Sequence, residues 1–367
     1  MHRMSAPLFG VILAVASVST ARAETVTYGA YLSPSNPVIT GGLEPLRAQI
    51  AESTGGGLVI EPQIGGSIVK ERTTLEGIES GVVSAGYVVD AYLPSELPHS
   101  TLINDLGMGP ADIRAGSLAV TEFQLLGCPG CAGDLKRAGV NSLAIHRISD
   151  YYLLCRQGIT SSAQLSGKRI KATGNWSMIA TNVGASVVNV PASDMYEAFQ
   201  RGLIDCAIAP HYWLRTMSLW DSIKVVFDLP LGAFQGGHMM TVSSEVWEDL
   251  GDRHRAAVLD AMPDMILGVS NEFLSIEADV RREAAEHGVS YVPADDGLVS
   301  AFEKAREEAV RNAIDRARRA RVADPEALVS GFRDTLAKWE KILDETGEDR
   351  AALAARARSE IYDRIRR

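Results

Sequence analysis

Short hydrophobic runs alternate with amphipathic stretches over the first 150 residues of the chain. The pattern predicts strands at residues 25–30, 58–62 and 82–89, and helices at 43–53 and 69–80. Strands that alternate with helices in this way build mostly parallel sheets with helices on both faces. The pattern therefore predicts that the first part of the chain forms an α/β unit.

A second unit of the same kind begins after Asp150. The pattern predicts strands at residues 151–155, 168–172, 187–190 and 203–207, with helical segments between them. From Ser243 onward the polar and apolar spacing is overwhelmingly helical. We expect Pro263 to break or kink the first long helix of this region, because proline removes one backbone hydrogen bond.

The N-terminus has the layout of a secretory signal peptide. A positive start at Met1 to Arg3 precedes a small apolar run at residues 7–20, and Ala21-Arg22-Ala23 supplies the small residues that signal peptidase reads. We expect residues 1–23 to be removed before Glu24. No cysteine follows for a lipid anchor, and no later run reaches about 18 apolar residues. The sequence thus predicts export to the periplasm without membrane insertion.

Composition and charge narrow the classes of partner. The chain is 46% hydrophobic and 22% charged, which is typical of a globular protein. Its formal charge of −10 argues against nucleic acid and against an anionic membrane surface as partners. A single local cation can still bind a small anion.

Four cysteines are present, at positions 128, 131, 155 and 206. In an oxidising compartment they are expected to form disulfides, and three pairings are possible. We favour Cys128 with Cys131 and Cys155 with Cys206. The alternative for the C-x-x-C pair is an extracytoplasmic thiol oxidoreductase. A thioredoxin-like site follows a strand directly, whereas residues 121–126 have the pattern of a helix end.

Signatures of catalysis are absent from the sequence. It contains no G-x-S-x-G, H-E-x-x-H or P-loop motif, and its seven histidines are scattered without metal-ligand spacing. We therefore expect no enzymatic activity, no metal and no cofactor.

Several segments together resemble the solute-binding proteins of TRAP (tripartite ATP-independent periplasmic) transporters, the dicarboxylate-binding-protein-like family. The resemblance is carried by LSGKRIK at 165–171, VGASVV at 183–188, PASDMYEAFQRGLID at 191–205, SEVWEDL at 244–250 and EHGV at 286–289. ESTGG at 52–56 and LEGIESG at 75–81 also fit.

The resemblance implies two α/β lobes with mixed, mostly parallel sheets, joined by crossing strands and a long inter-lobe helix. Lobe I would comprise residues 24–150 and about 237–275, and lobe II residues 151–236 and about 276–323. Residues 324–367 would form a helical extension that packs on the lobes. A small organic acid would be enclosed between the lobes and delivered to a membrane permease driven by an ion gradient.

Two candidate ligand-contact positions depart from the family pattern. Lys171 stands where most members have an arginine that binds the ligand carboxylate, and Ala209 stands where an asparagine faces the ligand. Asn104 and Asp105 replace an apolar Pro-Phe pair. Because Lys171 and Ala209 replace residues that bind the ligand in most members, the carboxylate ligand is the expectation that most needs an experimental test.

The candidate ligand contacts lie at strand ends, where crevice ligands bind in open α/β sheets. Lys171 would hold a negative group, and aromatic residues would form the pocket wall. The candidates are Lys171, Trp176, Ala209, His211, Tyr212 and Trp213 in lobe II, and Asn36, Asp90 and Tyr92 in lobe I. His238 is in the register of a family histidine. The alternative is a neutral or cationic ligand, held by the aromatic residues with Asp90 or Asp105 as counter-charge.

Overall fold

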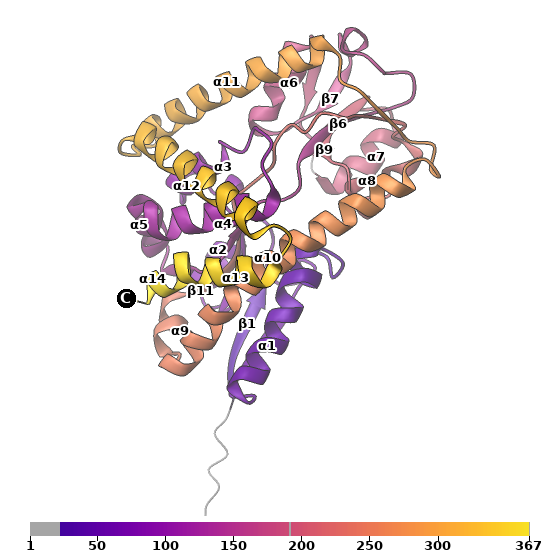
Figure 1. Ribbon diagram of the computed structural model, residues 1–367. Helices are drawn as coiled ribbons and strands as arrows, with labels where there is room; N and C mark the ends of the chain where they lie inside the picture. Colours follow the sequence, from indigo (N-terminus) through magenta and orange to yellow (C-terminus); the bar gives the residue numbers. More distant parts are fainter. Residues whose placement is uncertain (1–22, 191, 367) are drawn as a thin grey trace, which may run out of the picture.

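The computed structural model describes residues 23–190 and 192–366, which form two bodies joined by a long helix (Figure 1). The lower body in this view carries β1 and β11, and the upper body carries β6, β7 and β9. Residues 1–22, on which the signal-peptide expectation rests, lie outside the described residues. That expectation stays a prediction.

The first sheet is built mainly by the N-terminal part of the chain. Its strand order is β2-β1-β3-β11-β4, with β5 also paired to β11. The strands are β1 (Glu24–Gly29), β2 (Leu58–Gln63), β3 (Ala85–Val89), β4 (Val140–Ser142), β5 (Ile145–His146) and β11 (Gly237–Ser243). β1 runs parallel to β2 and β3, whereas β11 runs antiparallel to its neighbours. The sheet is therefore mixed, as expected.

The second sheet has the order β12-β10-β6-β9-β7-β8. Its strands are β6 (Tyr151–Cys155), β7 (Arg169–Lys171), β8 (Ser186–Val188), β9 (Cys206–Pro210), β10 (Val225–Phe227) and β12 (Ser290–Val292). The sequence placed the fourth of these strands at 203–207, three residues too early. Antiparallel pairing with β6, which sets Cys206 opposite Cys155, fixes the register instead.

Helices cover both sheets. In the first body they are α1 (Glu44–Thr54), α2 (Thr74–Glu79), α3 (Pro98–Asn104), α4 (Ile113–Glu122) and α5 (Pro129–Arg137). The second body has α6 (Ser177–Asn182), α7 (Met195–Gln200) and α8 (Trp213–Thr216). The C-terminal helices are α9 (Ser244–Asp249), α10 (Asp252–Glu283), α11 (Asp296–Arg319), α12 (Pro325–Thr346), α13 (Arg350–Ala357) and α14 (Asp363–Ile365). The largely helical C-terminal region matches the pattern of the sequence.

The chain passes between the bodies through two short segments, 147–150 and 228–236, through the helix α10, and again where α11 leads into α12, which packs on α4 of the first body. The 32 residues of α10 run through Pro263 without interruption, so the break expected there is wrong. Pro263 is buried, as are Leu259, Met262 and Ile266 on the two sides of it in the helix, and tertiary packing of these residues offsets the missing hydrogen bond. Ser270 of α10 contacts Ser117 in the first body, and Glu283 pairs with Arg215 in the second.

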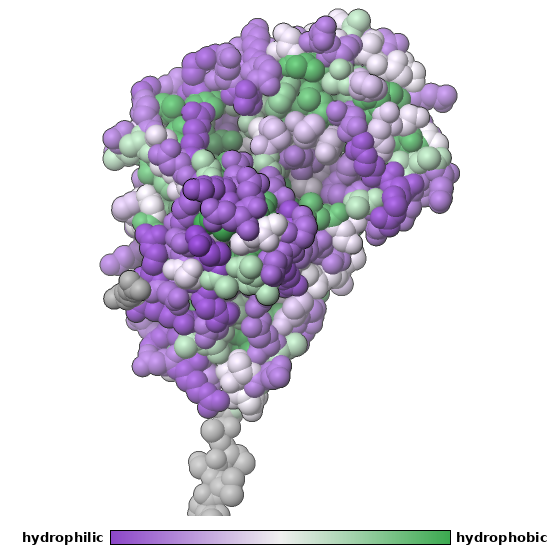
Figure 2. Space-filling model, viewed as in Figure 1, coloured by the Kyte–Doolittle hydropathy of each residue, from purple (hydrophilic) through white to green (hydrophobic). Residues whose placement is uncertain are grey.

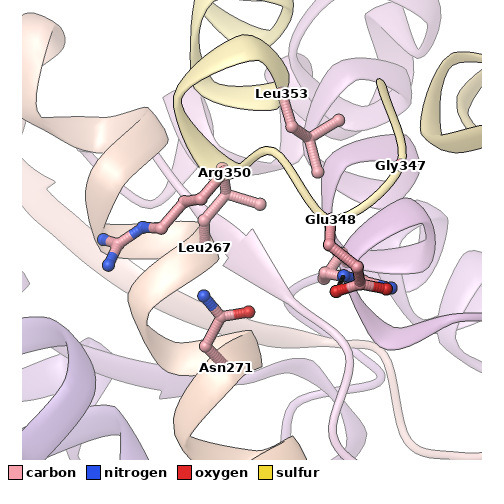
Figure 3. A pocket seen from close by; sticks show the side chains of 7 residues that line it. Leu267, Asn271, Gly347, Glu348, Arg350 and Leu353 are labelled. Atoms are coloured by element: carbon pink, nitrogen blue, oxygen red, sulfur yellow. Dashed lines mark hydrogen bonds and ion pairs between the residues drawn. The ribbon is translucent and has the colours of Figure 1, made fainter. Parts of the chain in front are cut away.

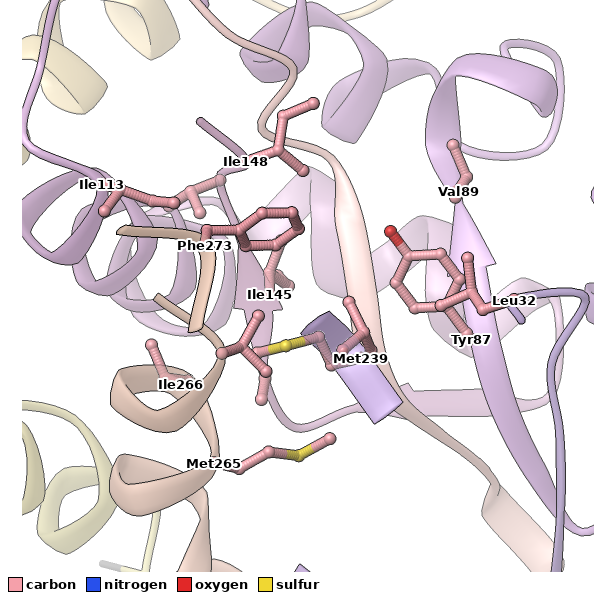
Figure 4. Close-up of a cluster of buried hydrophobic side chains, with 14 of the residues drawn as sticks. Leu32, Tyr87, Val89, Ile113, Ile145, Ile148, Met239, Met265, Ile266 and Phe273 are labelled. Carbon is pink, nitrogen blue, oxygen red and sulfur yellow. The ribbon is translucent and has the colours of Figure 1, made fainter. Parts of the chain in front are cut away.

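The core of the first body lies between its sheet and α10. Met265, Ile266 and Phe273 of α10 point toward Ile145 and Met239 of the sheet (Figure 4). These side chains are buried, so the helix is held to the sheet by apolar contact along its length. One end of α10 is thereby anchored, while its other end reaches the second body.

Both disulfides have the pairing that we favoured from the sequence. Cys155 and Cys206 join the neighbouring strands β6 and β9, and Cys128 and Cys131 join residues at the start of α5. All four residues are buried. Cys128 follows the helical segment 123–127 and not a strand, unlike the pair in a thioredoxin-like site.

The described part of the C-terminal extension, residues 324–366, packs against α4 and α10 of the first body. The indole Nε1 of the buried Trp339 donates to Glu122 of α4 at 2.7 Å, and the Tyr362 hydroxyl donates to the Leu143 carbonyl at 2.9 Å. Lys338 and Arg364 also pair with Glu122. The outer faces of α11 and α12 are mostly hydrophilic (Figure 2).

Glu122→Ala is expected to lower the free energy of unfolding by about 3 kcal/mol, because a buried indole N–H and two cations lose their acceptor. Urea denaturation measures the loss. The control is Glu360→Ala, which removes a more exposed partner of Lys338 and Arg356 and should cost less than about 1 kcal/mol. Equal losses would show that Glu122 is not a buried anchor of the extension.

Candidate functional site

Lys171 is the last residue of β7, and its side chain is buried at 4% exposure. Its backbone pairs with Val188 on one side and with Ala207 on the other. Burial lowers the pKa of the ammonium group to about 8. Among the residues that the structure describes, no carboxylate lies within 4.0 Å of its Nζ. A buried cation without a counter-charge is therefore present at the strand end.

One aromatic ring of the second body lies beside the Lys171 ammonium, and two others pack against each other. The Lys171 Nζ lies 5.3 Å from the centre of the Trp213 ring, at the start of α8. Trp176, five residues after Lys171, donates its indole N–H to the Leu231 carbonyl at 2.9 Å. The Tyr151 ring lies 4.8 Å from that of Trp176. The sequence had named Trp176, Tyr212 and Trp213 as wall residues, but not Tyr151.

The first body contributes further tyrosines that the sequence analysis missed. Tyr31 follows β1, and its ring lies 5.8 Å from that of Tyr87 in β3. Burial raises the pKa of Tyr31, and Tyr92, Glu71, Tyr212 and Tyr151 raise it further through charge repulsion. The strand-end rule that selected Asp90 and Tyr92 would also have found Tyr31, which follows β1, but not Tyr151, which begins β6.

A continuous series of ring contacts connects the two sets of tyrosines. The ring of Tyr87 lies 5.7 Å from that of His146, which is 5.9 Å from that of Phe273 in α10. Phe273 in turn lies 5.5 Å from Tyr212. Figure 4 shows Tyr87 and Phe273 on either side of Met239. The rings thus run from the first sheet, across α10, to the end of β9.

Asn36 and Asp90, two candidates from the first body, each have one side-chain oxygen in a local hydrogen bond, whereas the buried Asp90 Oδ1 has no hydrogen-bond partner. The Asn36 carboxamide oxygen accepts from the Val38 backbone N–H at 2.9 Å and fixes the turn before α1. Asp90 is fully buried, and Ser100 donates to it at 2.7 Å. Burial raises the pKa of Asp90 strongly.

His238 and Tyr92 complete the first-body candidates. The His238 Nε2 lies 3.0 Å from the Ser100 Oγ, so this histidine shares the interior network of Asp90. Tyr92 is 37% exposed, and the Arg72 guanidinium lies 5.5 Å from its ring centre. Of Asn36, Asp90 and Tyr92, only Tyr92 acts on another of these tyrosines: it raises the pKa of Tyr31.

Ala209 and His211 lie beside Tyr152, which points away from the side of β6 occupied by Tyr151. Ala209 is fully buried opposite Tyr152 in the sheet. The His211 ring stacks on Tyr152 at 4.7 Å and faces the carboxylate of Glu277 in α10. Tyr151 and Tyr152 therefore have different surroundings, because the side chains of consecutive strand residues point to opposite faces of the sheet. Tyr212 belongs to the ring series and the Tyr151 ring contacts Trp176, whereas Tyr152 and His211 contact each other instead.

The polar pair at 104–105 joins the two bodies. The Asn104 side-chain oxygen accepts from the Gln235 backbone N–H at 2.9 Å, within a crossing segment. Asp105 pairs with Arg316 of α11 at 2.6 Å, and its carbonyl accepts from Asn175 at 3.1 Å. These contacts account for polar residues where the family pattern has apolar ones.

Two cavities lie apart from Lys171. One, of about 60 Å³, is enclosed by α4, α10 and the start of α13, with Asn271, Glu348 and Arg350 in its wall (Figure 3). The other, of about 270 Å³, lies on the His211 side of the sheet, beside Glu277 and the crossing segment 148–150. In the described part of the chain, no group of three or more His, Cys, Asp or Glu residues is arranged to hold a metal ion. No described helix is long and apolar enough to span a membrane.

Comparison with known proteins identifies relatives over most of the chain. Residues 28–316 match the family model described as bacterial extracellular solute-binding protein, family 7. A monocarboxylate 2-oxoacid-binding periplasmic protein of a Nostoc species is 20% identical over 279 residues, which are 72% of each chain.

Solved structures share the fold. An extracytoplasmic solute receptor of Bordetella pertussis that binds pyroglutamic acid superimposes with a TM-score of 0.71 at 20% identity, covering 85% of this chain and all of its own. A TRAP solute-binding protein of Rhodoferax ferrireducens, in complex with benzoate, gives a TM-score of 0.74 at 16% identity and covers 87% of this chain and 99% of its own.

Proposed function

Because the chain belongs to family 7 of the bacterial extracellular solute-binding proteins, the binding proteins of TRAP transporters, we propose that Lys171 holds the carboxylate of its organic acid. Closure of the two lobes would enclose this ligand, and a TRAP-type permease would then receive it. The protein is a binding component of transport and not an enzyme. Its periplasmic location rests on the family and on the signal-peptide pattern.

The observation that carries this proposal is the buried, unpaired ammonium of Lys171. Burying a charge without a partner is costly, and the cost is recovered when an opposite charge arrives in the same desolvated site. A carboxylate supplies that charge. The buried charge of Lys171 would thus be neutralised only when an anion is bound.

Closure follows from the way the two bodies are joined. The crossing segments 147–150 and 228–236 are short, and α10 has one end in each body. Such connections permit hinge motion around a ligand, and the ligand favours the closed form by binding it more tightly. Tyr31 and Tyr92 would approach from the first body, and Lys171 and Trp213 from the second. The rings would exclude water and strengthen the ion pair.

Affinity for a carboxylate is expected to depend on pH through Lys171. The free ammonium has a pKa of about 8, and a bound anion would raise it. Affinity should therefore be constant below pH 8 and fall up to about tenfold per unit above it. Isothermal titration calorimetry between pH 6.5 and 10 measures this dependence. Lys171→Arg is the control, because its guanidinium stays charged and its affinity should not fall. A constant wild-type affinity up to pH 10 contradicts the assignment.

The alternative of a neutral or cationic ligand has less support in the structure. Asp90 points into the interior network of Ser100 and His238, and Asp105 pairs with Arg316. The carboxylate nearest the tyrosines is that of Glu71, which raises the pKa values of Tyr31 and Tyr92. A cation would have to be held by Glu71 while Lys171 repels it.

A thermal-shift screen separates these ligand classes. A molecule that binds only the folded protein raises its melting temperature. Organic acids should raise it, whereas amines and polyols should not. Stabilisation by amines alone would overturn the proposal. The thiol oxidoreductase alternative is disfavoured, because Cys128 and Cys131 are both buried in their disulfide.

A further inference from the structure

Three polar residues meet where α11 passes from the second body to the first. Arg316 lies near the end of α11, Asp105 follows α3 in the first body, and Asn175 lies between β7 and α6 in the second. We propose that these three residues form a latch that favours the described arrangement of the two bodies, and that Arg316 thereby positions the segment after Lys171. The positioning role concerns the site of the proposed function and rests on it, whereas the latch itself does not.

Each residue of the latch is hydrogen-bonded to the other two. The Arg316 guanidinium donates to the Asp105 carboxylate from its Nε at 3.2 Å and from its Nη2 at 2.6 Å. The same Nη2 donates to the Asn175 side-chain oxygen at 3.0 Å, and the Asn175 amide donates to the Asp105 carbonyl at 3.1 Å. A planar guanidinium can hold both partners at once, which the point charge of a lysine does not do in this geometry. The latch thus joins one residue of each body through a third residue on α11.

The burial of the latch determines what its loss would do. Asn175 is 5% exposed, and the side chains of Asp105 and Arg316 are 18% and 42% exposed. Burial raises the pKa of Asp105, although Arg316 lowers it. Without Arg316, the Asp105 carboxylate would lose its cation in a partly desolvated place. The carboxylate would regain water if the two bodies separated at this point, so the loss should favour a more open arrangement.

The helix α11 is packed on both bodies, and Figure 1 shows it extending from α6 to α12. Phe302, in its first half, belongs to the apolar core of the second body. Ala317, next to Arg316, lies in a separate apolar cluster with Leu102 of α3 and Val329 of α12. The helix α12 lies beyond the range that matches the family model. The latch is therefore held on one side by a segment that the family match does not include.

The latch adjoins the segment that leads away from the proposed ligand site. Asn175 directly precedes Trp176, whose indole N–H donates to the Leu231 carbonyl in a crossing segment at 2.9 Å. Lys171 is the last residue of β7, and only three residues separate it from Asn175. Because packed side chains transmit a displacement to their neighbours, a shift of Asn175 should also change the burial of Lys171.

The latch is tested by the distance between spin labels on the two bodies. Labels are attached at Glu52→Cys on α1 and at Leu203→Cys after α7, both at exposed positions. The labelled full-length protein is unfolded and refolded to remove any bound molecule. In pulsed electron paramagnetic resonance, Arg316→Met should raise the fraction of long distances at least about threefold. Arg311→Met removes an exposed charge from the same helix and should leave the distances unchanged. An unchanged distribution in Arg316→Met would overturn the latch.

A second variant shows whether the two charged residues act together. Asp105→Asn removes the same ion pair from its other side. Because both substitutions break one contact, the double variant should open the protein no further than Arg316→Met does alone. Additive effects on the fraction of long distances would show that the two residues act independently, and the latch would then be refuted.

The reactivity of the Lys171 amine tests the positioning role. Reductive methylation with formaldehyde, followed by mass spectrometry, should modify Lys171 at least about threefold faster in Arg316→Met than in the wild type, because the amine becomes more accessible. Lys304 is exposed and should react equally fast in both proteins. An unchanged rate at Lys171, with longer distances between the labels, would overturn the positioning role and support the latch alone.

These outcomes are distinguishable from a failure of the proposed function. Neither the distance measurement nor the methylation requires a carboxylate ligand. The proposed function fails if organic acids leave the melting temperature unchanged in the thermal-shift screen, whatever the labels and Lys171 show.

Discussion

Replacing Lys171 with methionine should abolish carboxylate binding and, at the same time, stabilise the ligand-free protein. Burial lowers the pKa of this ammonium from 10.5 to about 8. At neutral pH, where the group is charged, that difference corresponds to a folding cost of about 3 kcal/mol. Methionine has a similar length and no charge, so it removes the cost along with the anion site.

The sign of the effect follows from proton linkage. The unfolded chain holds the lysine proton more tightly than the folded one, so the penalty is complete below pH 8. It shrinks as pH rises toward 10.5. The stability gained by Lys171→Met should therefore be greatest near neutral pH and disappear above pH 10.5.

Two measurements check this prediction. Thermal denaturation of the ligand-free protein should show a higher melting temperature for Lys171→Met, and calorimetry should show no carboxylate binding. Lys304→Met removes an exposed charge from α11 and should change neither property. A variant that binds acids as before, or that is less stable than the wild type, would refute the role of Lys171. Tighter binding of an amine by the variant would favour the cationic ligand.

Removal of the disulfide between Cys155 and Cys206 should cost more stability than removal of the other one. Its cysteines are 51 residues apart in sequence, against three for Cys128 and Cys131. Because cross-links restrict the unfolded chain more when they close longer loops, the expected losses are about 4 and about 2 kcal/mol. The longer cross-link also joins two central strands of the second sheet.

Double cysteine-to-alanine variants of each pair test this expectation by urea denaturation. The Cys155/Cys206 variant should also bind ligand more weakly, since β6 begins at Tyr151 and β9 leads to Tyr212. The Cys128/Cys131 variant is the matched control, because its cross-link lies at the start of α5 in the first body. Equal losses of stability would show that loop length does not govern the difference.

The sequence alone determined the elements whose signal is local. The alternation of short apolar runs with helical spacing gave the α/β fold, and residues 151–155 were predicted as a strand with the bounds that β6 has. The position of Lys171 at a strand end also followed from the local pattern. Of the three cysteine pairings that the sequence left open, the structure has the one that we favoured.

The tertiary structure decided the features that depend on distant neighbours. β9 took its register from β6, and α10 passed through Pro263 because buried contacts on both sides support it. From the sequence, Asp90 and Tyr92 were both candidates for ligand contact because both follow the same predicted strand. In the structure, however, Asp90 lies within an interior hydrogen-bond network with Ser100.

The lysine at position 171 was thus identifiable from its sequence context, whereas its surroundings were not. Tyr151 and Tyr152 are equivalent in sequence, but only Tyr151 lies beside Trp176, while Tyr152 stacks on His211. Neighbouring side chains of a strand point to opposite faces, and the local sequence sets this alternation. Which face meets the ligand depends on how the second lobe and α10 pack, and these contacts join residues far apart in sequence, such as Arg215 and Glu283, which are 68 positions apart.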